Sequence, residues 1–263
     1  MFWRVRDIRR LIAWLAAMAA VGLSVWLLMV PPFTGVADNG DFSRLMRITG
    51  FSYLNPDETD ADRYFAYAHQ YFGYKSNSGP AYVTTQILPL AAIGWFARLF
   101  DGEVFDIRWF GAFYTALLAT ALYLLARFAP DFGGRRAAAA TFGVLLSAAL
   151  IFVFCDIGYL AYFQSFFGEP YALLGMLLSA ASVFAIARTD KPSGWLLALF
   201  VAAALAVATS KIQNAPLGFA FALLAWRMFF LREDRRWHRQ VLTGIGILLA
   251  ASVLMIASAP SGL

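Results

Sequence analysis

Long runs of apolar residues are the feature that most constrains this chain. A helix rises 1.5 Å per residue and the hydrocarbon core of a bilayer is about 30 Å thick, so one crossing needs about 20 apolar residues. Seven runs reach or approach this length, at residues 11–30, 109–128, 137–155, 171–188, 194–209, 215–231 and 241–258. The sequence therefore predicts an all-α, polytopic membrane protein with about seven transmembrane helices, forming a single membrane domain over residues 1–263.

Composition excludes the other broad classes. Hydrophobic residues make up 61% of the 263 residues and charged residues only 14%, against roughly 25% charged in ordinary soluble domains. A water-soluble monomer could not bury that much apolar surface. The 25 Phe, 8 Trp and 11 Tyr argue against disorder, and the single cysteine excludes an internal disulfide framework.

Basic residues predict the orientation in the membrane. Four arginines precede the first run, at positions 4, 6, 9 and 10, and Arg127, Arg135 and Arg136 follow the second. By the positive-inside rule both groups are cytoplasmic, so residues 31–108 form a large outer loop and the chain ends outside. The first run ends at Pro31-Pro32 without a small-residue cleavage site, which indicates a span and not a signal peptide. We expect a multi-pass protein of the bacterial inner membrane. The basic residues are split among short turns, which is poor support for nucleic-acid binding.

The apolar stretch 81–100 decides the topology. An odd number of crossings must separate the outer loop from Arg127, yet two apolar runs lie between them. This stretch carries Thr84, Thr85, Gln86 and a central Pro89, which suits a shallow helix in the outer interface. We therefore expect 81–100 to be interfacial, with a plain crossing as the alternative.

The first polar cluster opens the outer loop. Asp38, Asn39 and Asp41 lie on a glycine-flexed turn just past the first span, and Arg44 follows Asp41 by three residues, within salt-bridge reach on a helix. Helix capping by Asp41 would explain one acid and not both, so we expect a functional role for this turn.

Two further clusters lie at predicted outer ends of spans. Glu169 precedes Pro170 at the head of a span, where an acid also favours the positive end of the helix dipole. Lys211 stands with Gln213 and Asn214 between two apolar spans. The lysine is either a snorkelling side chain or, with the neighbouring amides, a binding site for a lipid phosphate.

In order, these motifs resemble the GT-C superfamily of integral membrane glycosyltransferases, and most of all its bacterial cell-surface glycan hexose transferases. The resemblance rests on the acidic motif 37–42, the pattern Phe105-Asp106-Ile107-Arg108 at the head of a crossing, and the aromatic second loop 162–169 that ends in an acid. It covers nearly the whole chain and implies interfacial helices in the first outer loop.

The resemblance implies a reaction at the outer face. A sugar, expected to be a hexose, would move from a polyprenyl-phosphate donor to a glycan, lipid or protein acceptor. Asp38 or Asp41 would be the base, with Asp38 preferred because an aromatic follows it four residues later. Lys211 would meet the lipid phosphate, and Glu169 would orient the acceptor or hold a divalent cation, since some members use a metal and others do not. The further residues expected to contact substrate are Arg44, Tyr162, Gln164, Gln213 and Asn214.

Two other functions remain alternatives. Members of that superfamily are usually longer, so the chain could be a minimal core, or an inactive or split-enzyme subunit that binds membrane lipids or a partner. A transporter of polyprenyl-linked glycans is the other alternative. It would carry ionisable residues within its spans, and the spans here are nearly free of them.

Overall fold

The computed structural model describes residues 5–55, 57, 67–75, 84–129 and 136–258. The predicted residues Arg4 and Arg135 and the start of 81–100 lie outside them. Within the described ranges, five helices are long and apolar enough to cross a membrane. They are α1 (Val5–Met29), α5 (Arg108–Arg127), α6 (Arg136–Phe154), α8 (Glu169–Ala187) and α11 (Arg235–Ala257). The chain is thus a helical, multi-pass membrane protein.

Three apolar helices are shorter. Helices α9 (Gly194–Ala208) and α10 (Leu217–Phe229) extend about 22 and 20 Å, below the bilayer thickness of about 30 Å. The turn around η2 (Ile212–Asn214) separates them, and α10 begins and ends inside the expected run 215–231. Helix length therefore supports five membrane crossings among the described residues, and the count of seven stays a prediction. Helix α4 (Ile87–Ala97) extends about 16 Å, half of a straight crossing.

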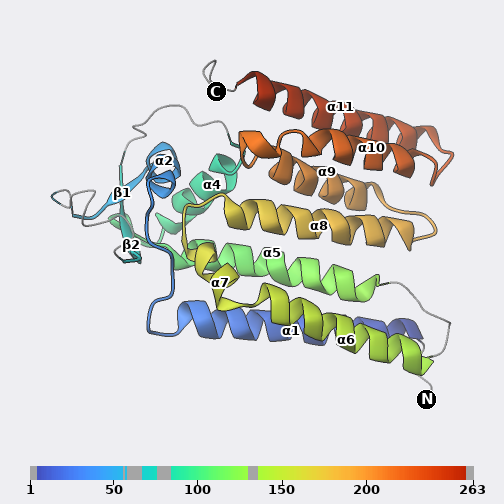
Figure 1. Cartoon of the computed structure of the whole chain (residues 1–263), viewed down its shortest axis with the longest axis horizontal. Helices are drawn as coiled ribbons and strands as arrows, with labels where there is room; N and C mark the ends of the chain where they lie inside the picture. Colours follow the sequence, from blue (N-terminus) through green and yellow to red (C-terminus); the bar gives the residue numbers. More distant parts are fainter. Residues whose placement is uncertain (1–4, 56, 58–66, 76–83, 130–135, 259–263) are drawn as a thin grey trace.

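The long helices form a bundle whose two ends differ (Figure 1). Helix α1 packs on α5 and α6, α5 packs on α8, α8 on α9, and α11 lies on α9 and α10. The segments between α1 and α5, including α2 (Asp41–Ile48) and α4, gather at one end, where α8 begins and α9 ends. The three polar clusters of the sequence thus share one end of the bundle.

A small antiparallel sheet also lies at that end, and it corrects the all-α expectation. Strands β1 (Phe51–Tyr53), β2 (Tyr71–Tyr74) and β3 (Val104–Asp106) pair in the order β1-β2-β3. In the register Phe72 lies opposite both Tyr53 and Phe105. The segment between α1 and α5 therefore contains a sheet as well as helices.

The sheet is joined to the bundle by an aromatic core. Phe51, Phe72 and Phe105 are fully or almost fully buried, and Phe166 of the loop before α8 lies 5.3 Å from the Phe51 ring and 5.2 Å from the Phe72 ring. The burial of several aromatic side chains fixes the loop 161–168 against this sheet. Phe163, Phe166 and Phe167 therefore do not form an aromatic belt at the membrane surface, because their side chains are buried.

Candidate functional site

Helix α2 presents the first acidic residue. It begins at Asp41 after Gly40, whose φ of 98° favours glycine, and it buries Phe42, Leu45 and Met46. Asp41 is the first helical residue and not the N-cap, so capping does not account for it. Its Oδ1 lies 3.1 Å from Nη1 of Arg44, which confirms the expected ion pair, and both side chains are about 60% exposed.

Asp38 has the opposite environment. It is only 2% exposed, and both carboxylate oxygens accept hydrogen bonds. Oδ1 accepts from the backbone N–H of Gly40 at 2.7 Å, and Oδ2 accepts from the Tyr53 hydroxyl at 2.5 Å. Asp38 thus ties the loop before α2 to strand β1 and does not face a solvent-filled space.

Lys211 and Glu169 form an ion pair between the start of α8 and the turn after α9. Lys211 Nζ lies 2.5 Å from Glu169 Oε1, and both side chains are partly exposed. Gly168 lies beside them. A Cβ added there would stand 3.3 Å from Gln86 Oε1 and 3.5 Å from Lys211 Cε, so the glycine lies against both side chains.

Gln86 is a buried amide at the same place, directly before α4. It is fully buried, and its Nε2 donates to the Phe167 carbonyl at 2.9 Å and to the Tyr114 hydroxyl at 3.1 Å. Its Oε1 has no hydrogen-bond partner among the described residues. Because the carbonyl of Phe167 can only accept, it fixes the amide with the Nε2 toward Phe167 and leaves the Oε1 available to a donor.

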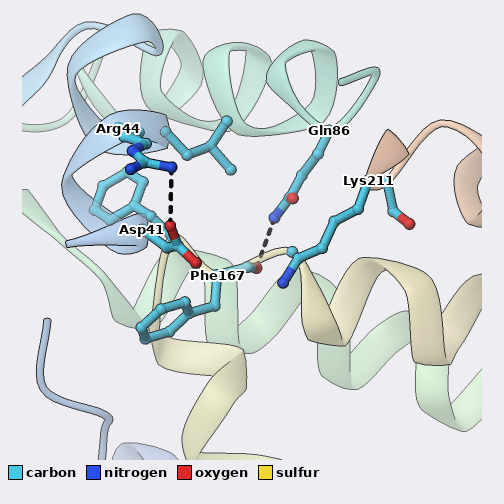
Figure 2. Close-up of a pocket in the computed structure, with 9 residues that line it drawn as sticks. Asp41, Arg44, Gln86, Phe167 and Lys211 are labelled. Atoms are coloured by element: carbon cyan, nitrogen blue, oxygen red, sulfur yellow. Dashed lines mark hydrogen bonds and ion pairs between the residues drawn. The ribbon is translucent and has the colours of Figure 1, made fainter. Parts of the chain in front are cut away.

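The side chains of Asp41, Arg44, Gln86 and Lys211 line one cavity (Figure 2). Its free space, including the part open to solvent, is about 330 Å³. Asp41 and Arg44 form one side, Lys211 lies across from them, and Gln86 and Phe167 stand between. Glu169 joins through its pair with Lys211. An acidic loop residue, two cations and a buried amide therefore converge from four segments far apart in the sequence.

The remaining predicted residues lie apart from this cavity. Gln164 is buried, and its amide donates to the Leu28 carbonyl at 2.6 Å. The Tyr162 ring packs 5.6 Å from that of Phe167. Asn214 donates to the Ser210 hydroxyl at 2.8 Å, and Gln213 is exposed. None of these four residues lines the cavity.

The motif at the head of α5 has a structural explanation. The Asp106 carboxylate accepts from Nε and Nη2 of Arg108 at 2.8 and 2.5 Å, and from Gln70 at 3.3 Å. The backbone N–H of Ile107 donates to the Gln70 carbonyl at 3.0 Å. These bonds join strand β3 to the segment before β2. The motif Phe105-Asp106-Ile107-Arg108 therefore stabilises the fold and does not contribute to the cavity.

Gln86 is the site residue that the sequence did not single out. Its signal is the polar triplet Thr84-Thr85-Gln86 at the head of an apolar run, which we used only to judge whether that run crosses the membrane. Among the described residues, no group of three or more His, Cys, Asp or Glu side chains lies close enough together to hold a metal ion.

Fold and site together define a multi-pass helical membrane protein with a mixed-charge cavity at one end of its bundle. The chain belongs to the YfdI N-terminal transmembrane domain family, whose family model matches residues 3–263. No curated protein and no solved structure matches it.

Proposed function

We propose that this domain transfers a sugar from a polyprenyl-phosphate donor to an acceptor hydroxyl at the outer membrane face. The observation that carries the proposal is the cavity lined by Asp41, Gln86 and Lys211, which pairs a carboxylate with a cation within one site. The substrates in this proposal are those that the resemblance to GT-C glycosyltransferases implies. The outer location follows from the arginine-rich ends of the spans, which favour the cytoplasm.

Asp41 is the base in this proposal. Its carboxylate is exposed at the cavity, whereas both oxygens of Asp38 are already occupied by hydrogen bonds. A base must reach the proton that it removes, so accessibility favours Asp41 over the Asp38 expected from sequence spacing. Arg44 pairs with the Asp41 carboxylate at 3.1 Å and so holds it at the edge of the cavity.

The step balances as a displacement at the anomeric carbon. The acceptor oxygen forms a bond to that carbon, its proton passes to Asp41, and the bond from the carbon to the phosphate oxygen breaks. The polyprenyl phosphate leaves with one more negative charge than it had as a diester. Lys211 lies where a cation can offset that charge, and Gln86 Oε1 can accept a hydrogen bond from a sugar hydroxyl.

The test is sugar transfer in proteoliposomes containing purified protein, a polyprenyl-phosphate hexose and membrane glycolipid acceptors. We expect Asp41→Asn to lower the rate about 10²–10⁴-fold and Lys211→Gln about 10²–10³-fold. Asp57→Asn, which removes an exposed carboxylate from the same outer segment, is the matched control and keeps the wild-type rate. Equal turnover by the Asp41, Lys211 and control variants would refute the proposal.

A further inference from the structure

A second site lies at the other end of the bundle, between α9 and α11. A groove there is lined by small and apolar residues of both helices, among them Ala198, Val201, Leu205 and Ile247. Its free space, including the part open to the surroundings, is about 1130 Å³. A Cβ added to Gly244 would stand 2.8 Å from Val201 Cγ2, so the two helices meet closely at the floor of the groove.

The groove changes from polar to apolar along its length. Arg236, Arg239, Gln240 and Thr243 line the end near the start of α11, and the lining residues that follow on that helix are Gly244 and Ile247. A separate polar cavity of about 610 Å³ adjoins this end and shares Gly194, Arg236 and Gln240 with the groove. One compartment therefore suits a charged group, and the next suits hydrocarbon.

The two arginines are available to a ligand. Arg236 and Arg239 are exposed, and neither has a hydrogen bond or an ion pair within the described part of the chain. The nearby acid, Asp234, already accepts from Arg232 at 2.6 Å and caps α11 through the Trp237 N–H at 2.9 Å. Arg232 thus offsets the negative charge of Asp234, and Arg236 and Arg239 leave a net positive charge at the mouth of the groove.

The length of the groove identifies the kind of occupant. On α11 its lining runs from Arg236 to Ile247, which corresponds to about 16 Å along the helix axis. This matches one leaflet, half of the hydrocarbon thickness of about 30 Å. A crossing helix of another protein would need a contact surface along the whole of α11, which continues to Ala257.

We propose that this groove binds one anionic glycerophospholipid, with its phosphate at Arg236 and Arg239 and an acyl chain between α9 and α11. Guanidinium groups bind phosphate oxygens through charge-assisted hydrogen bonds, and the small side chains of α9 leave space for the hydrocarbon. The site is independent of the cavity at the opposite end of the bundle and of the function proposed for it.

Native mass spectrometry of the purified protein in detergent tests this inference, with phosphatidylglycerol and phosphatidylcholine as the two probes. We expect one phosphatidylglycerol to stay bound at concentrations where phosphatidylcholine does not. Arg239→Gln weakens this binding about fivefold, and Arg236→Gln does the same. Arg235→Gln removes an exposed charge one residue from Arg236 but outside the groove, and it leaves binding unchanged.

A groove-filling variant separates the acyl contact from surface charge. Ala202→Phe, on the exposed side of α9, keeps both arginines and lowers phosphatidylglycerol binding. Four results would overturn the inference: an equal loss with Arg235→Gln, equal retention of phosphatidylcholine, displacement of the lipid by inorganic phosphate alone, and tighter binding of undecaprenyl phosphate at the same arginines. A dimer mass that disappears with Ala202→Phe would assign the groove to a second copy of the chain instead.

Discussion

Asp38 should act as a structural clamp, and its removal should destabilise the fold. Its buried carboxylate holds Gly40 and Tyr53 through bonds of 2.7 and 2.5 Å. A hydrogen bond to a charged group contributes about 1.5–3 kcal/mol, so we expect Asp38→Ala to lower the free energy of unfolding by about 3–6 kcal/mol. Tyr53→Phe removes one of the two bonds and should lower it by about 1.5–3 kcal/mol.

Thermal unfolding in detergent, followed by tryptophan fluorescence, measures these changes. At about 2–4 °C per kcal/mol for a chain of this size, Asp38→Ala should lower Tm by roughly 6–24 °C. The double variant should unfold close to the Asp38 single variant, because the Tyr53 bond is already lost in it. Asp57→Ala is the control and leaves Tm unchanged. An Asp38→Ala protein with the wild-type Tm and no transfer activity would refute this reasoning and return Asp38 to the role of base.

Three further predictions concern the two ends of the bundle. Gly168→Ala keeps an accessible backbone conformation but adds a Cβ 3.3 Å from Gln86 Oε1, so it should slow sugar transfer while Tm stays near the wild type. Gln86→Leu leaves the buried Phe167 carbonyl without its amide donor and should lower the free energy of unfolding by about 1–3 kcal/mol, measured by thermal unfolding. The pKa of Asp234 is lowered chiefly by the hydrogen bond from the Trp237 N–H. The stabilisation by the Asp234 carboxylate is therefore present at neutral pH and is lost as pH falls below about 4. Asp234→Ala should unfold more readily than the wild type at pH 7, and the two proteins should unfold equally readily at low pH.

The helices were predictable because each carries a long apolar run. Each of the seven expected runs overlaps a described helix, although α10 is shorter than its run at both ends. The sheet was not predictable in the same way. Its strands contain three or four residues, too few to show an alternation, and they lie in the loop where the resemblance implied only interfacial helices.

The site was predictable in its residues and not in its geometry. Asp41, Arg44, Glu169 and Lys211 stood out because charges are rare next to apolar spans, and they do converge. Spacing could not show that Asp38 turns inward, since that depends on Tyr53 of a strand that the sequence did not reveal. Gln86 was missed because its partners, Tyr114 and Phe167, come from distant segments.

Photo-crosslinking with a polyprenyl phosphate that carries a diazirine beside its phosphate tests the central claim most directly. Mass mapping of the labelled peptides should find the label at Phe167–Gly168 and Ser210–Lys211, and Lys211→Gln should reduce that labelling. Labels spread along the lipid-facing surfaces, or gathered at the α9–α11 groove and unaffected by Lys211→Gln, would contradict the account.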